Sequence, residues 1–277
     1  MLTLSPNRGG IDLAATLGCG QVFQWYSDGA GGWRGIVDGA PVRARQEGGA
    51  LVCDSPLPAG RIRAYFRLDD NLEAIYASFP DDAQQAVAAF RGMRLVQQDL
   101  WECLLSFVCA TNANIPRIHK MIAALCRRYG DEAGEGLYSF PTAASLAAAN
   151  EGDLRALGLG YRAAHLLAMA RRVDGGLFDL SELTRMDYAS AHARLQALPG
   201  VGPKVADCVC LFSLGYLRAV PVDTWVRRMV QRRAPGLRSY RAMAEFAQAW
   251  LGPYAGYAQQ YLFHYERTQA GWGCGGQ

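Results

Sequence analysis

A turn between two predicted helices has the sequence Leu198-Pro-Gly-Val-Gly-Pro-Lys204. Gly200 and Gly202, with Val201 between them, let the backbone turn tightly and come close to a ligand. The N–H groups that open the second helix have no partner within it, so they favour an anion such as a DNA phosphate. Such a helix–hairpin–helix holds phosphates without reading base sequence. A plain helical hairpin would show the same glycines, so the turn alone leaves both interpretations open.

Lys204 and Asp223 are the candidate catalytic residues near this turn. Lys204 lies in the first turn of its helix, where the positive end of the helix dipole disfavours an ammonium and favours the neutral amine that attacks carbon. Asp223 ends the loop Val220-Pro-Val-Asp223 and precedes a helix that begins at Thr224. Asp223 either caps that helix or holds a carboxylate against positive charge that develops on a sugar.

Lysine is rare in this chain. Of the 28 basic residues, only Lys120 and Lys204 are lysines, and the others are arginines. A GC-rich genome accounts for this bias without a functional reason. Lysine nevertheless differs chemically, because it can lose its proton and act as a nucleophile whereas arginine keeps its charge. The net charge of +3 is only weak support for a nucleic-acid partner.

Outward from the turn, the sequence predicts an α+β fold that is mainly α. Residues 1–70 carry short strand-like stretches separated by turn clusters such as Asp38-Gly39, which predicts an N-terminal antiparallel β domain. Residues 71–277 carry apolar residues at three- and four-residue spacing, which predicts a helical domain. The expected strands are 2–4, 11–13, 21–25, 33–37, 42–45 and 50–53. The expected helices are 84–90, 100–109, 118–129, 143–149, 162–173, 188–198, 205–215, 240–250 and 257–269.

Composition excludes several classes of protein. No stretch of about 18 uncharged apolar residues predicts a membrane span, and the N-terminus lacks the pattern of a secretory signal, so we expect a cytoplasmic, reducing location. Cys208 and Cys210 are two apart, and no second pair at zinc spacing accompanies them. Near the C-terminus only Cys274 is present, too few thiols for an iron–sulfur cluster. We therefore expect no metal and no cofactor.

These motifs together resemble the helix–hairpin–helix DNA glycosylases that carry a Gly/Pro-rich loop and an aspartate. More narrowly, the chain is similar to the 8-oxoguanine DNA glycosylase/lyases of the eukaryotic-type branch. The similarity covers almost the whole chain, and the combination of segments is specific although each segment alone is not. The matching segments are Gly20-Gln-Val-Phe-Gln-Trp25, Trp101–Asn112, Leu157–Arg162, Leu198–Asp223 and Gly252–Gln259.

The resemblance implies base excision from double-stranded DNA that contains 8-oxoguanine, without a cofactor. The amine of Lys204 would attack C1′ of an extruded nucleotide and expel the base, after which a Schiff base and β-elimination would nick the strand. Asp223 would stabilise the positively charged sugar. Extrusion is required because C1′ and the base edges are shielded in the stack.

The resemblance also implies a pocket for the damaged base. Cys208 follows Lys204 by four residues and so shares its helix face. By resemblance Cys208 covers one face of the base and Phe263 the other, while Gln259 reaches the Watson–Crick edge. The carbonyl of Gly20 would accept from N7–H, a donor that 8-oxoguanine has and guanine lacks. The alternative is that Cys208 and Phe263 are plain core residues.

The resemblance assigns the opposite strand to Asn112, Arg117 and Arg162, which would read cytosine with a preference for that base. Arginine donors match the acceptors N3 and O2 of cytosine. Tyr161 would act as a flat wedge that buckles the base stack. Residue type alone favours simpler roles, because Asn112 fits a helix-end cap and Arg117 fits a solvated charge.

Two positions depart from the family pattern. Ala113 interrupts a run of asparagines, and Trp225 stands in the place of a histidine near the damaged strand. Trp225 cannot accept a hydrogen bond, so its expected role is packing or an N–H donated to phosphate. The basic cluster that follows fits either phosphate contact or a solvated helix face: Arg227, Arg228, Arg232 and Arg233.

Two other functions fit parts of the pattern. A glycosylase of the same superfamily that acts on alkylated bases generally needs no lysine nucleophile, so Lys204 argues against it. A non-catalytic DNA-binding module would use hairpins as phosphate clamps and would need neither Lys204 nor Asp223. The expected partner is double-stranded DNA and the expected state is a monomer.

Overall fold

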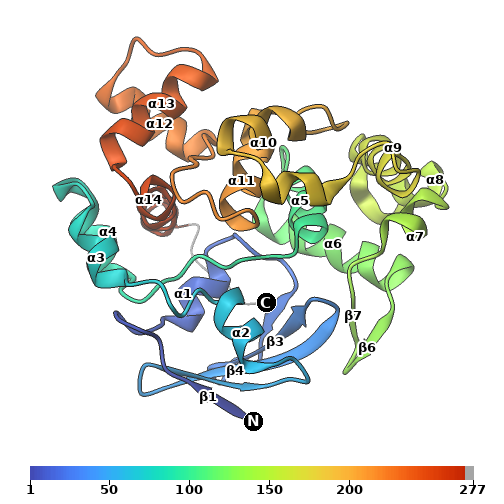
Figure 1. Cartoon of the computed structure of the whole chain (residues 1–277), viewed down its shortest axis with the longest axis horizontal. Coiled ribbons are helices and arrows are strands. Elements are labelled where there is room, and N and C mark those ends of the chain that lie inside the picture. The colour runs from blue at the N-terminus through green and yellow to red at the C-terminus, as the bar shows by residue number, and fades with distance from the viewer. Residues whose placement is uncertain (272–277) are drawn as a thin grey trace.

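The computed structural model describes residues 1–271, and its N-terminal part is built around a five-stranded antiparallel sheet (Figure 1). The strand order is β1-β5-β4-β3-β2. Two-residue turns join β3 to β4 at Asp38-Gly39 and β4 to β5 at Gly48-Gly49, and their positive φ angles suit such hairpins. The bounds are β1 Leu2–Leu4, β2 Trp25–Ser27, β3 Gly32–Val37, β4 Ala40–Glu47 and β5 Ala50–Asp54. Cys274, expected to hold no cluster, lies outside the described residues.

Two short helices, α1 (Leu13–Gly18) and α2 (Ala59–Tyr65), pack with the sheet. Trp25 is buried in this core and donates its indole N–H to the Tyr65 hydroxyl at 2.8 Å. This first core draws on residues up to Leu68 and on Val96. The second core draws mainly on residues from Leu72 onward. Ala15, Cys19 and Phe23 also pack in the second core, so the division into domains 1–70 and 71–277 stays a prediction.

The rest of the chain is helical, as the periodicity predicts, except for a small hairpin of β6 (Glu132–Gly134) and β7 (Leu137–Tyr138). Polar side chains cap the first turns of several helices; for example, Asp99 accepts the Glu102 N–H at 2.9 Å and caps α5. The helices are α3 Leu72–Ala77, η1 Asp81–Ala83, α4 Gln84–Ala89, α5 Leu100–Cys109, α6 Ile115–Tyr129, α7 Ala143–Ala147, α8 Glu151–Leu154, η2 Arg155–Leu159, α9 Arg162–Asp174, η3 Leu180–Arg185, α10 Tyr188–Leu195, α11 Pro203–Phe212, α12 Thr224–Arg233, α13 Tyr240–Leu251 and α14 Ala255–Gln269.

Two expected strands are wrong. Residues 11–13 lead into a helix, because the Asp12 side chain accepts the Ala15 N–H at 2.8 Å and caps α1. Of residues 21–25, only Trp25 belongs to a strand. The amide of Gln21, rather than a backbone ladder, makes the bonds here: it donates to the carbonyls of Thr16 and Arg94 and accepts from the Val96 N–H.

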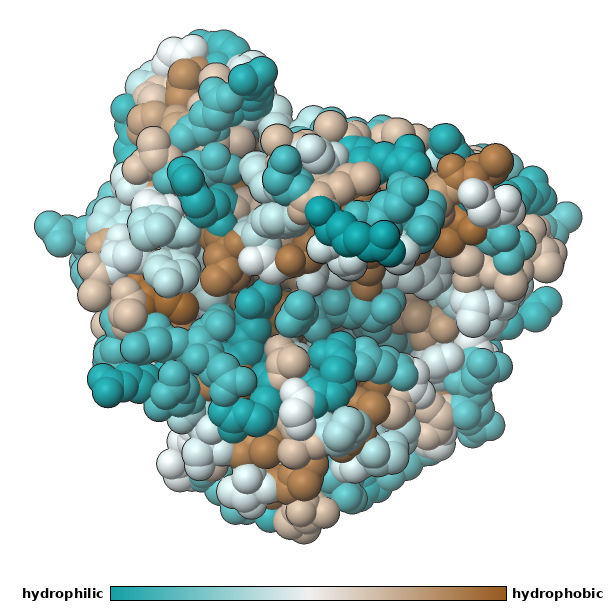
Figure 2. Space-filling view, viewed as in Figure 1, coloured by the Kyte–Doolittle hydropathy of each residue, from teal (hydrophilic) through white to brown (hydrophobic). Residues whose placement is uncertain are grey.

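Helix α14 packs against α4, α12 and α13 of the helical part and also contacts the N-terminal part. Figure 1 shows α14 beside α1 and the α3–α4 pair, above the sheet. Gln260 of α14 donates to the Cys19 carbonyl at 3.3 Å, and Gln98 donates to the Gln21 carbonyl at 2.9 Å. These buried bonds fix the segment around Gly20 against the helical part. On the face shown in Figure 2, hydrophilic side chains gather across the middle with smaller apolar areas among them. Within residues 1–271, every helix is too short or too polar to cross a bilayer.

Candidate active site

The turn between α10 and α11 has the geometry of a phosphate-binding hairpin. Gly200 has φ +80, and a Cβ there would lie 2.8 Å from the Cβ of His165, so the position requires glycine. Gly202 begins α11 without capping it through a side chain, and Pro203 occupies the first turn. The remaining N–H groups of that first turn are therefore open to an anion, as the sequence predicts.

Lys204 projects from the first turn of α11, as predicted, and is partly buried. Its Nζ lies 5.2 Å from the centroid of the Phe107 ring, which in turn stacks on Phe212. Burial raises the pKa of the Cys208 thiol, one helical turn further on, to about 12, and the charge and hydrogen bond of Lys204 oppose that shift. Cys208 is thus a neutral thiol at neutral pH.

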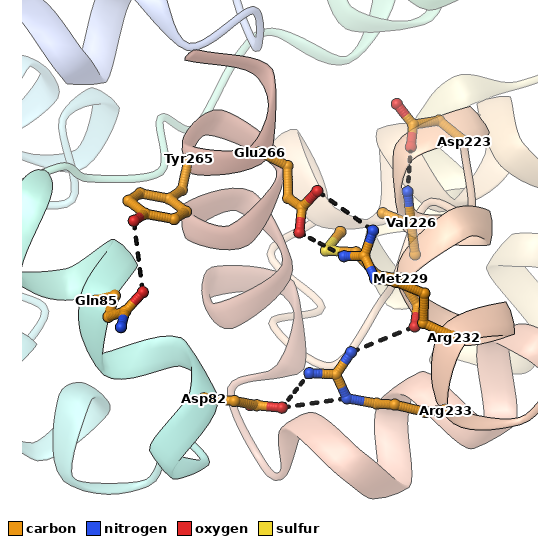
Figure 3. Close-up of polar contacts among 9 residues, drawn as sticks. All are labelled: Asp82, Gln85, Asp223, Val226, Met229, Arg232, Arg233, Tyr265 and Glu266. Atoms are coloured by element: carbon orange, nitrogen blue, oxygen red, sulfur yellow. Dashed lines mark hydrogen bonds and ion pairs between the residues drawn. The ribbon is translucent and has the colours of Figure 1, made fainter. Parts of the chain in front are cut away.

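Asp223 has the first of the two roles that the sequence left open, because it caps a helix, and its carboxylate also lines the site. Its Oδ1 accepts the N–H groups of Trp225 at 2.9 Å and Val226 at 2.8 Å, which caps α12; the bond to Val226 is drawn in Figure 3. Burial raises the pKa of Asp223, while the N–H bonds and the positive charge of Lys204 lower it. Because both cap bonds go to Oδ1, the cap also holds the carboxylate in one orientation beside the lysine.

A single cleft brings these groups together. It has a volume of about 870 Å³, which is in the range of small-molecule sites. Lys204, Asp223, Gly20 and Phe263 all line it, together with the hairpin glycines. Gly20 has φ +89, and a Cβ there would lie 2.5 Å from Ile115 Cδ1, so the wall is closed to any larger residue. The cleft suits one extruded base with its sugar.

Gln259 and Cys208 lie buried beside this cleft rather than in its lining. Gln259 is 4% exposed, and among the described residues its Oε1 atom has no hydrogen-bond partner. A buried acceptor left alone costs about 1–3 kcal/mol, so such an atom indicates a ligand donor. Gln259 precedes Phe263 by four residues on α14, which places both on one helix face.

Only some of the residues expected to face the opposite strand lie close to one another. Asn112 lines the cleft with φ +51, and its amide donates to the Tyr161 hydroxyl at 3.2 Å. Tyr161 is 45% exposed, as a wedge requires. Arg162 is 2% exposed, and its guanidinium donates to the carbonyls of Thr111 and Leu159. Arg117 is exposed on α6, away from the cleft lining.

Comparisons with known proteins agree with this arrangement. Residues 3–104 match the N-terminal domain of 8-oxoguanine DNA glycosylase, and residues 105–252 match the HhH-GPD superfamily of base excision DNA repair proteins. A probable N-glycosylase/DNA lyase of Methanothermobacter thermautotrophicus is 32% identical, over 94% of each chain. The chain belongs to the 8-oxoguanine DNA glycosylase family.

Solved structures extend the comparison. The 8-oxoguanine glycosylase/lyase of Clostridium acetobutylicum, solved with double-stranded DNA containing cytosine opposite 8-oxoguanine, is 31% identical with a TM-score of 0.87, covering 94% of this chain and 93% of that one. The 3-methyladenine DNA glycosylase of Archaeoglobus fulgidus shares the fold, with a TM-score of 0.78 at 22% identity over 96% of this chain and 99% of that one. The enzyme therefore has the α+β, mainly α, fold expected of a bifunctional glycosylase and DNA lyase.

The sequence did not single out a buried carboxylate beside the nucleophile. Asp207 is 1% exposed and accepts the hydroxyls of Tyr188 and Tyr240, both at 2.5 Å. The Tyr240 hydroxyl also accepts the N–H of Val222, the residue before Asp223, at 3.1 Å. The only available signal was a charge within an apolar helix, which does not reveal these distant partners.

The basic cluster of α12 divides into two pairs of different surroundings. Arg232 forms an ion pair with Glu266 of α14, and Arg233 forms one with Asp82 of η1, as Figure 3 shows. These two arginines join α12 to its neighbours. Arg227 lines the cleft, and Arg228 lies over Trp225, 5.3 Å from the ring centroid. Trp225 also lines the cleft, and its role, packing or an N–H donated to phosphate, stays a prediction.

Proposed function

We propose that this enzyme excises 8-oxoguanine from double-stranded DNA, with Lys204 as the nucleophile and Asp223 as the stabilising carboxylate. One observation carries the proposal: both side chains line one cleft of the size of an extruded nucleotide base. The family supplies the bifunctional glycosylase and lyase activity. We further propose that the enzyme acts as a monomer.

The reaction begins with a neutral amine. Lys204 Nζ attacks C1′, and the glycosidic bond breaks with its electron pair leaving on the base, which takes up a proton. Asp223 stabilises the positive charge that develops on the sugar as this bond breaks. The nitrogen then loses a proton and the sugar ring opens to a Schiff base. Removal of a 2′ proton expels the 3′ phosphate, and water finally releases the lysine.

Recognition of the base uses the walls of the cleft and the buried residues beside it. Phe263 stacks on one face of the purine and Cys208 covers the other, while the unpaired Oε1 of Gln259 accepts from the Watson–Crick edge. The Gly20 carbonyl accepts from N7–H of 8-oxoguanine. Guanine has an acceptor at N7, so it would leave two acceptors facing each other and be disfavoured.

The opposite strand is held at the rim. Tyr161 wedges into the stack, and Asn112, Arg117 and Arg162 contact cytosine. Arg162 reaches the cytosine acceptors by exchanging its bond to the Thr111 carbonyl for the base. The hairpin of Gly200, Val201 and Gly202 binds a backbone phosphate through its N–H groups.

Borohydride trapping tests the central step. Duplex DNA carrying 8-oxoguanine opposite cytosine is incubated with enzyme and borohydride, and the adduct is located by peptide mapping. We expect the adduct at Lys204, with Lys120 and the N-terminal amine as built-in controls. An adduct elsewhere, or base release by the Lys204→Gln variant at the original rate, would refute the assignment.

A second comparison separates the remaining alternatives. If Lys204→Ala abolishes nicking but leaves DNA affinity unchanged, the non-catalytic clamp is excluded. Release of methylated purines with none of 8-oxoguanine would favour the glycosylase for alkylated bases instead.

A further inference from the structure

Arg267 is a nearly buried cation in the wall of the base cleft, and the proposed mechanism does not use it. It is 6% exposed and lines the same cleft as Gly20 and Phe263. It follows Phe263 by four residues on α14, so the two side chains share one helix face. Burying a guanidinium is costly unless its donors are satisfied, so its contacts indicate what it does.

The guanidinium joins the Gly20 segment to α14. Its Nη2 donates to the Gly18 carbonyl at 3.0 Å, and Nη1 lies 3.2 Å from the place where a Cβ on Gly20 would stand. The guanidinium carbon lies 5.4 Å from the centroid of the Phe263 ring. One planar group therefore touches both the loop that offers a carbonyl to the base and the ring that stacks on it.

His264 completes the arrangement. Its Nδ1 lies 3.1 Å from Arg267 Nη2, and its ring packs on Phe90 at 4.2 Å between centroids. Burial and the charge of Arg267 lower the pKa of His264 to about 4. The imidazole is therefore neutral at neutral pH, so Nδ1 accepts from Arg267 and holds the guanidinium in place.

We propose that Arg267 is a positioning residue for base recognition, which fixes the loop of residues 18–20 against the Phe263 ring and thereby sets selectivity for an oxidised purine over the unmodified one. The inference rests on the proposed excision of 8-oxoguanine. 8-Oxoguanine has a hydrogen-bond donor at N7, whereas guanine has an acceptor there. Selectivity therefore depends on the position of the Gly20 carbonyl relative to the stacked base. Gly20 and Phe263 come from distant parts of the chain, and Arg267 sets their spacing.

The test compares two substrates that use the same nucleophile. Nicking at a preformed abasic site needs Lys204 but no base pocket, whereas excision needs both. For Arg267→Met we expect single-turnover excision of 8-oxoguanine to fall about 10- to 100-fold, the scale of a misplaced reacting group. Abasic-site nicking should stay within about twofold, and the ratio of 8-oxoguanine to guanine excision should fall. Arg267→Lys should recover part of the excision rate.

The matched control is Arg232→Met. It removes a guanidinium that pairs, away from the cleft, with Glu266 of α14, the helix that also carries Arg267. It should leave both activities near those of the unmodified enzyme. Equal loss of excision and nicking in Arg267→Met would overturn the proposal, as would unchanged selectivity. If the Met variant does not fold, Arg267→Lys carries the test, with a smaller loss confined to excision. Failure of the unmodified enzyme to excise 8-oxoguanine would refute the proposed function rather than this inference.

Discussion

Replacing Tyr240 by phenylalanine removes one hydroxyl, and that hydroxyl ties α11 to the loop that carries Asp223. It donates to Asp207 Oδ2 at 2.5 Å and accepts the Val222 N–H at 3.1 Å. Asp207 is 1% exposed and Val222 is 3% exposed, so bulk water does not replace either bond. The proposed nucleophile lies on α11 and the proposed stabilising carboxylate caps α12, and this hydroxyl bridges the two segments.

The expected loss of stability follows from the two hydrogen bonds of the Tyr240 hydroxyl. A hydrogen bond to a carboxylate contributes about 1.5–3 kcal/mol, and a stranded buried N–H costs about 1–3 kcal/mol. Because neighbouring groups relax around the missing oxygen, we expect Tyr240→Phe to lower the free energy of unfolding by about 2–4 kcal/mol. A shift of Asp223 approaching 1 Å costs on the order of 100-fold in rate. We therefore expect single-turnover excision and abasic-site nicking to fall together, by about 10- to 100-fold.

Tyr188→Phe is the matched control. Its hydroxyl also donates to Asp207 at 2.5 Å, but it has no bond to the loop of Val222. Thermal unfolding and single-turnover rates are measured for both variants, under conditions where each is folded. Because Tyr188→Phe removes the bond to the carboxylate without stranding the Val222 N–H, it should lose less stability, about 1.5–3 kcal/mol, and keep its rate within about threefold. Equal rates in the two variants would refute the argument that the bond to Val222 positions Asp223.

Two further predictions concern carboxylates. Asp223→Asn keeps a good helix cap and removes a buried charge, so thermal unfolding at pH 7 should show unchanged or higher stability. The excision rate should fall at least about 100-fold, because the carboxylate charge is lost. A clear loss of stability would contradict this prediction. Burial, with Asp99 and Asp38 nearby, raises the pKa of partly buried Glu102 from 4.5 to about 8. The unfolded chain releases that proton near pH 4.5 and the folded enzyme holds it to about pH 8, so stability falls as pH rises through this window. Glu102→Gln should remove this pH dependence. In denaturant titrations, we expect its free energy of unfolding to exceed that of the unmodified enzyme by about 1–2 kcal/mol at pH 8–9 and by little at pH 4. An equal increase at both pH values would contradict the assignment.

The parts of the site that the sequence predicted depend on local chemistry. The position of Lys204 follows from two glycines and two prolines in the preceding five residues, and the cap formed by Asp223 follows from the helix that begins at the next residue. The four-residue spacings to Cys208 and from Gln259 to Phe263 follow from helix geometry alone. The roles assigned to these residues in base recognition stay predictions until the substrate experiments are done.

The parts that the sequence did not predict depend on contacts between distant residues. Residues 21–25 look like an apolar strand, but Gln21 satisfies backbone groups as far away as Val96. Arg267 meets Gly18 across 249 positions of the chain, and Tyr240 meets Asp207 across 33. No periodicity or cap motif specifies such pairs. The expected strand at 11–13 is different, because the Asp12 cap was present as a local signal.

Chemistry and recognition are held by separate contacts in this enzyme. Asp207 and Tyr240 link α11 to the loop before α12, and so control the geometry of attack at the sugar. Arg267 links the Gly20 loop to α14, and so controls the geometry around the base. Nicking at an abasic site depends only on the first set, whereas excision depends on both. The double variant Tyr240→Phe with Arg267→Met should therefore show additive free-energy losses in excision but only the Tyr240 loss in nicking. A large coupling between the two substitutions in excision would mean that the sugar and base geometries move as one unit.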